Sequence, residues 1–141
     1  MDVANQYESD TAGKLAALNA GEILYNEGRY EEAAEYLRKF SCGDDVLEAN
    51  ALILTGDCYV NLEKYPEAID YYQKAIRKAN GNPQIVPRVL LKEANVYDAE
   101  QNYTKALECY QIIKDSYPGF QLGNSLDIDA YIAREAARIG G

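Results

Sequence analysis

The sequence predicts an all-α fold, an α-α superhelix of three helix pairs followed by a C-terminal capping helix. One basis is a phrase of the type Tyr-x-x-Ala that begins at Tyr30, Tyr65 and Tyr103, so that its copies lie 35 and 38 residues apart. The other is that turn signals, such as the Asn-Gly-Asn-Pro run at 80–83, separate the segments with helical periodicity. A period of roughly 20 to 50 residues is typical of arrays in which each repeat buries its apolar face against its neighbours.

The three copies share a wider pattern, which is clearest in the second. Gly56 lies nine residues before Tyr65, Tyr59 follows the glycine by three, and Tyr72 comes four residues after Ala68. Small residues let two helix backbones approach closely, while tyrosines fill the volume around the contact. The equivalent small residues of the other two copies are Gly21 and Ala94.

Helix start and stop signals place the individual elements. Thr11 is the expected N-cap of the first helix, Gly28 is expected to break it, and Pro66 fits the first turn of the fourth helix, where its missing N–H costs nothing. The run 41–45 is expected to be a turn with its own cap. The expected helices cover about 11–26, 31–40, 46–62, 66–78, 87–100, 104–116 and 125–139.

This arrangement of small, apolar and aromatic residues resembles the tetratricopeptide repeat (TPR) family. The resemblance implies a TPR solenoid that binds proteins and performs no catalysis. The first copy departs from the family pattern by having Leu24 and Leu37 where aromatic residues are common. In the family register, the chain divides into an N-terminal lead-in at 1–13, repeats at 14–47, 49–82 and 87–120, and a capping helix at 125–139.

Several short phrases also resemble bacterial TPR proteins of the Bacteroidetes type, which are related to translocon-associated and envelope-assembly subunits. The phrases lie at 7–11, 21–25, 56–59, 91–94 and 127–134. Proteins of that type carry a membrane-spanning helix before the repeats, which this sequence lacks, so the resemblance implies the soluble part of an anchored protein. It would then lie on the periplasmic side of a bacterial inner membrane. A cytoplasmic location is the alternative, because three cysteines without a pairing pattern fit a reducing compartment.

Composition excludes several kinds of partner. The net charge of −9 and the pI near 4.5 argue against nucleic acid and against adsorption to anionic lipid, since both require a basic surface. No segment approaches the roughly 18 consecutive apolar residues of a membrane span, so direct membrane insertion by this segment is not expected. The expected partner is therefore a protein or a peptide.

The sequence offers no catalytic, cofactor or metal site. It contains no histidine, which removes the commonest general base and metal ligand. Asp127 and Asp129 fall at a predicted helix start without the other ligands of a calcium loop, and Asn102 suits a helix cap better than a glycosylation site. Cys58 and Cys109 lie in predicted helices, where a small buried thiol is the ordinary interpretation. An enzyme is not expected.

The first helix of each pair is expected to line a partner-binding groove, as it does in the family. The candidate groove residues are Leu18, Glu22, Tyr25 and Asn26 in the first repeat, Asn50, Ile53, Leu54, Asp57 and Asn61 in the second, and Arg88, Leu91, Lys92, Asn95 and Asp98 in the third. Arg88 and Lys92 form a basic spot that suits an acidic group on a partner. The alternative is a structural module whose groove is filled by its own N-terminal segment or by a second copy, as in a homodimer.

Overall fold

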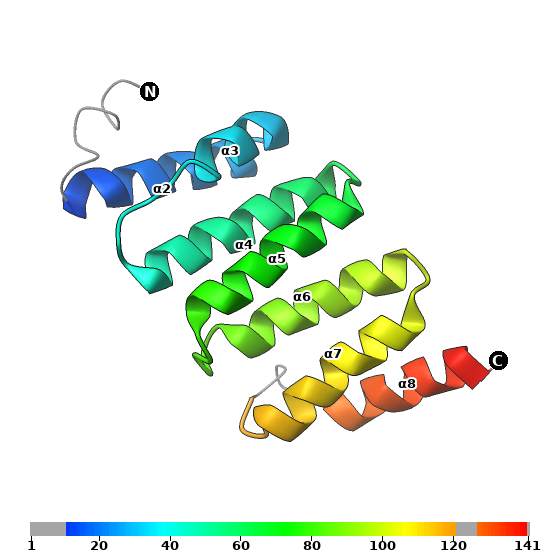
Figure 1. Cartoon of the computed structure of the whole chain (residues 1–141). Coiled ribbons are helices and arrows are strands. Elements are labelled where there is room, and N and C mark those ends of the chain that lie inside the picture. Colours follow the sequence, from blue (N-terminus) through cyan, green and yellow to red (C-terminus); the bar gives the residue numbers. More distant parts are fainter. Residues whose placement is uncertain (1–10, 121–126, 141) are drawn as a thin grey trace. The chain divides into compact units, whose positions relative to one another are not determined.

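The computed structural model of the chain describes residues 11–120 and 127–140 (Figure 1). All regular structure in this part of the chain is helical, without a strand, which confirms the predicted all-α class. The helices are α2 (Thr11–Asn26), α3 (Tyr30–Leu37), α4 (Asp45–Asn61), α5 (Tyr65–Ala79), α6 (Val86–Ala99), α7 (Tyr103–Ser116) and α8 (Ile128–Gly140).

The helices form two compact units, which divide after Ala79. In unit 1, α2 packs on α3, α3 on α4, and α4 on α5, so that two antiparallel helix pairs lie side by side (Figure 1). In unit 2, α7 packs on α6 on one side and on α8 on the other. The most extensive packing in unit 1 is therefore between α4 and α5, the pair with the clearest sequence pattern.

The same turn connects the two helices of every pair. Gly28, Glu63 and Gln101 occupy equivalent positions, with positive φ angles of 78°, 59° and 61°. The amide of the next residue in each case donates to a carbonyl five residues earlier, at 3.0 Å, 2.8 Å and 2.8 Å. This is a Schellman ending, in which a residue in the left-handed conformation closes the helix. Only the first turn uses glycine there, so the sequence signal for a break was clear at Gly28 alone.

Three helices of the described residues begin at side-chain caps, one of them α8, where Asp127 accepts from the amide of Asp129 at 2.9 Å. Asp44 accepts a hydrogen bond from the amide of Leu47 at 3.0 Å, and Asn102 accepts one from the amide of Lys105 at 3.3 Å. Backbone amides in the first turn of a helix have no carbonyl partner within the helix. A carboxylate or carboxamide oxygen at the N-cap supplies the missing hydrogen-bond acceptor. The cap expected in the run 41–45 and the cap expected at Asn102 are thus confirmed.

Two expected boundaries were wrong. The second helix ends at Leu37, three residues before the predicted end at Phe40, because the amide of Phe40 bonds to the carbonyl of Leu37 in a tight turn. This turn packs Phe40 against the unit 1 core. Thr11 is the first helical residue of α2, so it is not a cap that precedes the helix. The start predicted for the last helix, at 125, falls outside the described residues.

The loop between α3 and α4 is held by charged side chains. The carboxylate of Glu48 accepts hydrogen bonds from the amides of Cys42 and Gly43, at 2.9 Å and 2.6 Å, and these bonds lower the pKa of Glu48. Lys78 of α5 lies 3.1 Å from the same carboxylate, and Lys14 of α2 donates to the carbonyl of Cys42 at 3.2 Å. The loop therefore joins three helices of unit 1.

The unit 1 core depends on very close helix approach at two glycines. A Cβ atom added to Gly56 of α4 would lie 2.5 Å from the ring of Tyr72 in α5, and one added to Gly21 of α2 would lie 2.2 Å from Leu37 in α3. Tyr72 and Leu37 are each only 2% exposed. In both pairs, the first helix thus has a glycine where it contacts the largest buried side chain of the second helix.

The unit 2 core includes a buried carboxyl group. Glu93 of α6 is 4% exposed, and one of its oxygens lies 3.7 Å from the sulfur of Cys109 in α7 while the other has no hydrogen-bond partner. Burial raises the pKa of Glu93 to about 7. On the other side of α7, Tyr110 stacks on Tyr131 of α8 with ring centroids 5.0 Å apart.

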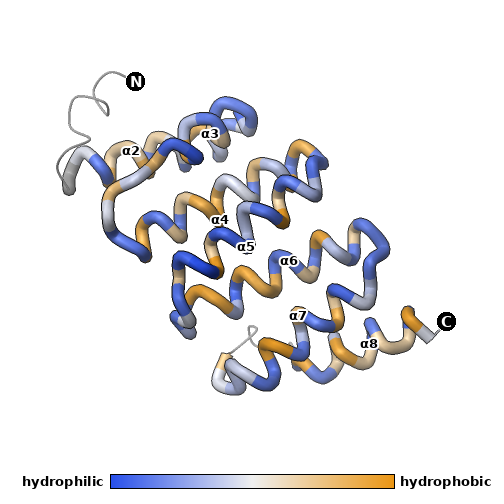
Figure 2. The backbone as a smooth tube through the Cα atoms, viewed as in Figure 1, coloured by the Kyte–Doolittle hydropathy of each residue, from blue (hydrophilic) through white to orange (hydrophobic). Residues whose placement is uncertain are grey.

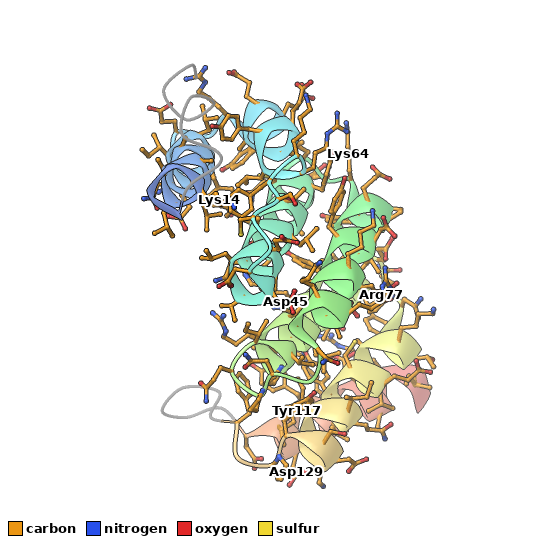
Figure 3. All side chains as sticks on the ribbon, turned by 60° about the vertical axis from the view of Figure 1, so that its left-hand side comes forward. Lys14, Asp45, Lys64, Arg77, Tyr117 and Asp129 are labelled. Atoms are coloured by element: carbon orange, nitrogen blue, oxygen red, sulfur yellow. The ribbon has the colours of Figure 1, made fainter. Side chains whose placement is uncertain are left out.

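Hydrophilic and hydrophobic residues alternate along the helices of both units (Figure 2). Lys64 and Arg77, labelled in Figure 3, are exposed side chains near the two ends of α5. Asp129, near the start of α8, forms an ion pair of 2.6 Å with Lys114 of α7. Because both partners are more than half exposed, this pair contributes little to stability.

The three cysteines are free; Cys58 and Cys109 are buried, as expected.

We predict that Gly56→Ala destabilises unit 1 by about 1–3 kcal/mol, because the buried ring of Tyr72 would have to move to admit the methyl group. The matched control is Gly119→Ala, whose added Cβ meets nothing within 4 Å. Denaturant unfolding followed by circular dichroism measures both. Equal stability of Gly56→Ala and wild type would show that the two helices are not in close contact there.

The buried carboxyl of Glu93 predicts that stability depends on pH. Its pKa is about 7 in the folded chain, well above its ordinary value of 4.5, so the folded chain takes up a proton more readily than the unfolded chain. The resulting stabilisation is fully present below the ordinary pKa and is lost as the pH rises through about 7. We therefore expect the melting temperature to fall between pH 5 and pH 8, and to fall less in Glu93→Gln. An identical pH profile in the two proteins would contradict this role of Glu93.

Candidate functional site

In unit 1, three of the predicted groove residues meet on neighbouring helices. The amide nitrogen of Asn61 in α4 donates to the hydroxyl of Tyr25 in α2 at 3.0 Å, and to the carbonyl of Asp57 at 2.9 Å. The hydroxyl of Tyr72 in α5 donates to the carboxylate of Asp57. Polar groups from three helices are therefore linked into one network on the α2–α4 side of the unit.

This network is polar but partly shielded from water. Burial raises the pKa of Tyr72 far above its ordinary value, and the charge of Asp57 adds to the effect. Burial also raises the pKa of Tyr25, although the hydrogen bond from Asn61 opposes the shift. Both hydroxyls consequently stay protonated near neutral pH and act as neutral hydrogen-bonding groups.

The other predicted residues of unit 1 divide into exposed and buried groups. Glu22 and Asn26 of α2 are exposed, and Asn50 of α4 is half-buried. Leu18 is 7% exposed within the core cluster and Leu54 packs against that cluster. Ile53 is also buried, at 9%. The accessible part of this predicted face is therefore polar, and the three aliphatic side chains contribute mainly to packing.

In unit 2, the predicted residues all lie on α6. Arg88 and Asn95 are exposed, whereas Leu91 and Lys92 are half-buried. The Nε atom of Arg88 donates to the carbonyl of Gln84, one turn before it, at 3.0 Å. That the residues of α6 and those of unit 1 line one groove stays a prediction.

The fifth predicted residue of α6, Asp98, belongs to a charged cluster with α8. Arg134 donates to one oxygen of Asp98 at 2.9 Å, and Arg138 donates to the other at 3.3 Å. Both arginines also donate to Glu135, which is completely buried, at 2.8 Å and 3.3 Å. Two guanidinium groups and two carboxyl groups thus hold the last turn of α6 to α8.

Tyrosines surround this charged cluster. The guanidinium carbon of Arg134 lies 4.8 Å from the ring centre of Tyr131, and that of Arg138 lies 5.2 Å from the ring centre of Tyr103 in α7. Arg134 also donates to the hydroxyl of Tyr110 at 3.3 Å. A guanidinium group is attracted electrostatically to the face of an aromatic ring, and the attraction is stronger where water is partly excluded.

The pKa of Asp98 is raised to about 6; burial is the largest cause, a hydrogen bond and the charge of Glu135 act in the same direction, and Arg134 and Arg138 act in the opposite direction. The cluster therefore carries about as much positive as negative charge near neutral pH, and it gains positive charge on acidification.

Sequence reasoning missed the contribution of α8. The apolar residues of this segment predicted a packing helix. Nothing in the sequence assigned a further role to Arg134 and Arg138, except that they lie one helical turn apart. That separation, with Glu135 between them, was the available hint, since i and i+4 residues share a helix face. The hydroxyl of Tyr72 was also missed, because the tyrosine pattern indicated packing alone.

The described residues show no sign of other chemistry. No group of three or more metal-binding side chains occurs among residues 11–120 and 127–140. Over the same ranges, no helix has both the length and the apolar character needed to cross a membrane. A shallow, open pocket between α3 and α4 is lined by residues such as Glu35, Arg38 and Tyr59, and it includes none of the predicted groove residues.

Family models match both halves of the chain. The model described as anaphase-promoting complex, cyclosome, subunit 3 matches residues 4–75, just over half of the chain, and a tetratricopeptide repeat model matches residues 88–119. Tetratricopeptide repeat protein 21B is 29% identical to this chain over 111 residues in Homo sapiens, covering 77% of the chain, and 28% identical over 122 residues in Mus musculus, covering 85%. The phagocyte signaling-impaired protein of Drosophila pseudoobscura pseudoobscura is 26% identical over 91 residues, covering 64% of the chain.

The chain spans less than a tenth of the length of these relatives, with shares of 8%, 9% and 9%. Tetratricopeptide repeats generally act as non-catalytic scaffolds that bind proteins or peptides, and neither matching family model describes an enzyme. The model matches agree with the antiparallel helix pairs, the recurrent left-handed turn and the small residues at the helix contacts. Taken together, these findings show that the chain belongs to the tetratricopeptide repeat family.

Proposed function

We propose that this chain is a scaffold that binds a segment of a partner protein along the polar faces of α2 and α4, the first helices of the two pairs in unit 1. The observation that supports this most directly is the hydrogen bond between Asn61 and Tyr25, which joins the polar faces of α2 and α4. A continuous polar surface over two helices can contact several residues of one bound segment.

Exposed amide side chains suit the backbone of such a segment. Asn26 and Asn61 occupy equivalent positions, 35 residues apart, at the ends of α2 and α4, and both are exposed. A carboxamide such as that of Asn26 can donate and accept hydrogen bonds, whereas the nitrogen of Asn61 already donates to Tyr25 and Asp57, so its oxygen is the group that can accept from a partner's peptide N–H. Glu22 and Asp57 add negative charge to this face of unit 1.

The finer assignments are part of the same proposal. We place the repeat boundaries at 14–47, 49–82 and 87–120, with a capping helix at 125–139; what supports this is that most of one helix pair falls within each repeat interval. A bacterial, membrane-proximal setting rests on the sequence phrases given above. Fractionation of the native host tests it: recovery of the full-length protein away from the envelope would contradict it.

Self-association is a second candidate function, and exposed apolar side chains favour it. Leu15 and Ile23 of α2 are 42% and 57% exposed, although both are large aliphatic residues. Exposed apolar residues on one helix can pack against a second copy. Light scattering distinguishes the two functions: a mass of 15.7 kDa at every concentration would exclude the homodimer.

We predict that the double change Asn26→Ala and Asn61→Ala weakens binding of partner peptides about tenfold, which corresponds to about 1.4 kcal/mol. Peptides are first selected on the wild-type protein from a random displayed library, and affinities are then measured by fluorescence anisotropy. The melting temperature should fall modestly, because Asn61→Ala removes the hydrogen bond between α4 and α2, and affinities are therefore compared at a temperature at which both proteins are folded.

The matched control removes two exposed amides from second helices, through Gln73→Ala in α5 and Gln111→Ala in α7. This variant should bind as wild type does. Enrichment of no peptide on the wild-type protein would contradict the scaffold function, and equal losses in the two double variants would contradict the placement of the site on first helices.

A further inference from the structure

We propose that Arg134 and Arg138 of α8, together with Asn95 of α6, form a binding site for a carboxylate side chain of an acidic partner segment. This inference rests on the proposed scaffold function and identifies the chemistry of the partner at unit 2. It assigns to the C-terminal helix a part of the binding surface as well as its packing role.

The two guanidinium groups are held in fixed positions before any partner arrives. Arg134 is anchored by Asp98 at 2.9 Å and by Glu135 at 2.8 Å and 3.0 Å, while Arg138 lies 3.3 Å from an oxygen of each carboxyl group. The faces of the guanidinium groups lie near the rings of Tyr131 and Tyr103. Prior ordering of this kind lowers the entropy lost when a ligand binds.

Each guanidinium group keeps donors for a ligand. Among the described residues, the hydrogen bonds of Arg134 use its Nε and Nη2 atoms, and those of Arg138 use its Nη1 atom. The Nη1 atom of Arg134 and the Nε and Nη2 atoms of Arg138 therefore have capacity to donate. The side chains are 39% and 40% exposed, so a ligand can reach them. A planar guanidinium matches the two oxygens of a carboxylate.

The exposed charge of this cluster is positive, although its total charge is balanced. Glu135 is completely buried and Asp98 is only 17% exposed, whereas both arginines reach the solvent. In a chain of net charge −9, a local positive surface steers an acidic segment toward this place and repels a basic one.

Asn95 completes the site with a neutral polar group. It lies three residues before Asp98 on α6, so the two side chains are neighbours on the helix surface. Asn95 is exposed, and Asp98 is the residue to which both arginines bind. The amide of Asn95 is therefore placed to bond to the backbone beside a carboxylate that the arginines hold.

The test uses a fluorescently labelled poly-glutamate peptide with capped ends, titrated against the protein at low salt and followed by anisotropy. We expect Asn95→Asp to weaken binding about tenfold, which is about 1.4 kcal/mol, because it places a negative charge beside the bound carboxylate. The matched control is Gln111→Glu in α7, which adds the same charge to an exposed position of unit 2 and should bind nearly as wild type does. Neither residue belongs to the charged cluster, so folding is preserved in both.

A second variant, Arg134→Lys with Arg138→Lys, keeps the positive charge but removes the planar donors. It should bind poly-glutamate about tenfold more weakly while its helical content by circular dichroism stays unchanged. Two results would overturn the inference: equal effects of Asn95→Asp and Gln111→Glu, or no binding of poly-glutamate by the wild-type protein.

Failure of this inference can be separated from failure of the scaffold function. If library-selected peptides bind and respond to the Asn26 and Asn61 changes, but poly-glutamate does not bind, the scaffold function stands and the acidic partner site is rejected. If no library peptide binds and poly-glutamate does, the carboxylate site stands and the site on the first helices of unit 1 is rejected.

Discussion

Close contact between the two helices of a pair is the interaction on which the rest of unit 1 depends. At Gly56 the backbone of α4 comes so near the ring of Tyr72 that a single methyl group would not fit, and Gly21 meets Leu37 in the same way. A larger residue at either glycine would push the two helix backbones apart. Contacts this close therefore allow only one arrangement of the two helices. The same 16-residue spacing relates Ala94 and Tyr110 in unit 2, where both residues are completely buried.

The buried aromatic residue also connects packing to the polar surface. The ring of Tyr72 fills the core, while its hydroxyl reaches the carboxylate of Asp57. Tyr110 is equally buried, and its hydroxyl accepts a hydrogen bond from Arg134. Tyrosine is suited to this position because one end is apolar and the other forms hydrogen bonds. A residue that holds the helix pair together thereby also orients the charged groups of Asp57 and Arg134.

The fold could be predicted from the sequence because its signals are local and repeated. The spacing of Tyr30, Tyr65 and Tyr103 fixed the pairing of helices, and Asp44 and Asn102 marked helix starts. The end of α3 was predicted less well, because Phe40 leaves the helix to pack on the core, and a tertiary contact of this kind leaves no periodic signal.

The candidate site was predictable only in part. The repeat register placed Tyr25 and Asn61 on one polar face, and a hydrogen bond joins them. It also assigned Leu18 to the groove, although this side chain lies in the core, where it packs in one cluster with residues of α3 and α4. The arginines of α8 could not be found in this way, since α8 contains no copy of the Tyr-x-x-Ala phrase that set the repeat register, although Asp98 lies 36 residues before Arg134.

In the proposed binding mode, partners contact α2 and α4 in unit 1 and α6 and α8 in unit 2, while the second helices of the pairs support them. Amide chemical shifts of the isotope-labelled protein, recorded while a library-selected peptide is added, test this claim residue by residue. The account predicts that the largest shifts occur at α2, α4, α6 and α8, near Asn26, Asn61, Asn95 and Arg134. Shifts confined to the exposed faces of α3, α5 and α7 would contradict it.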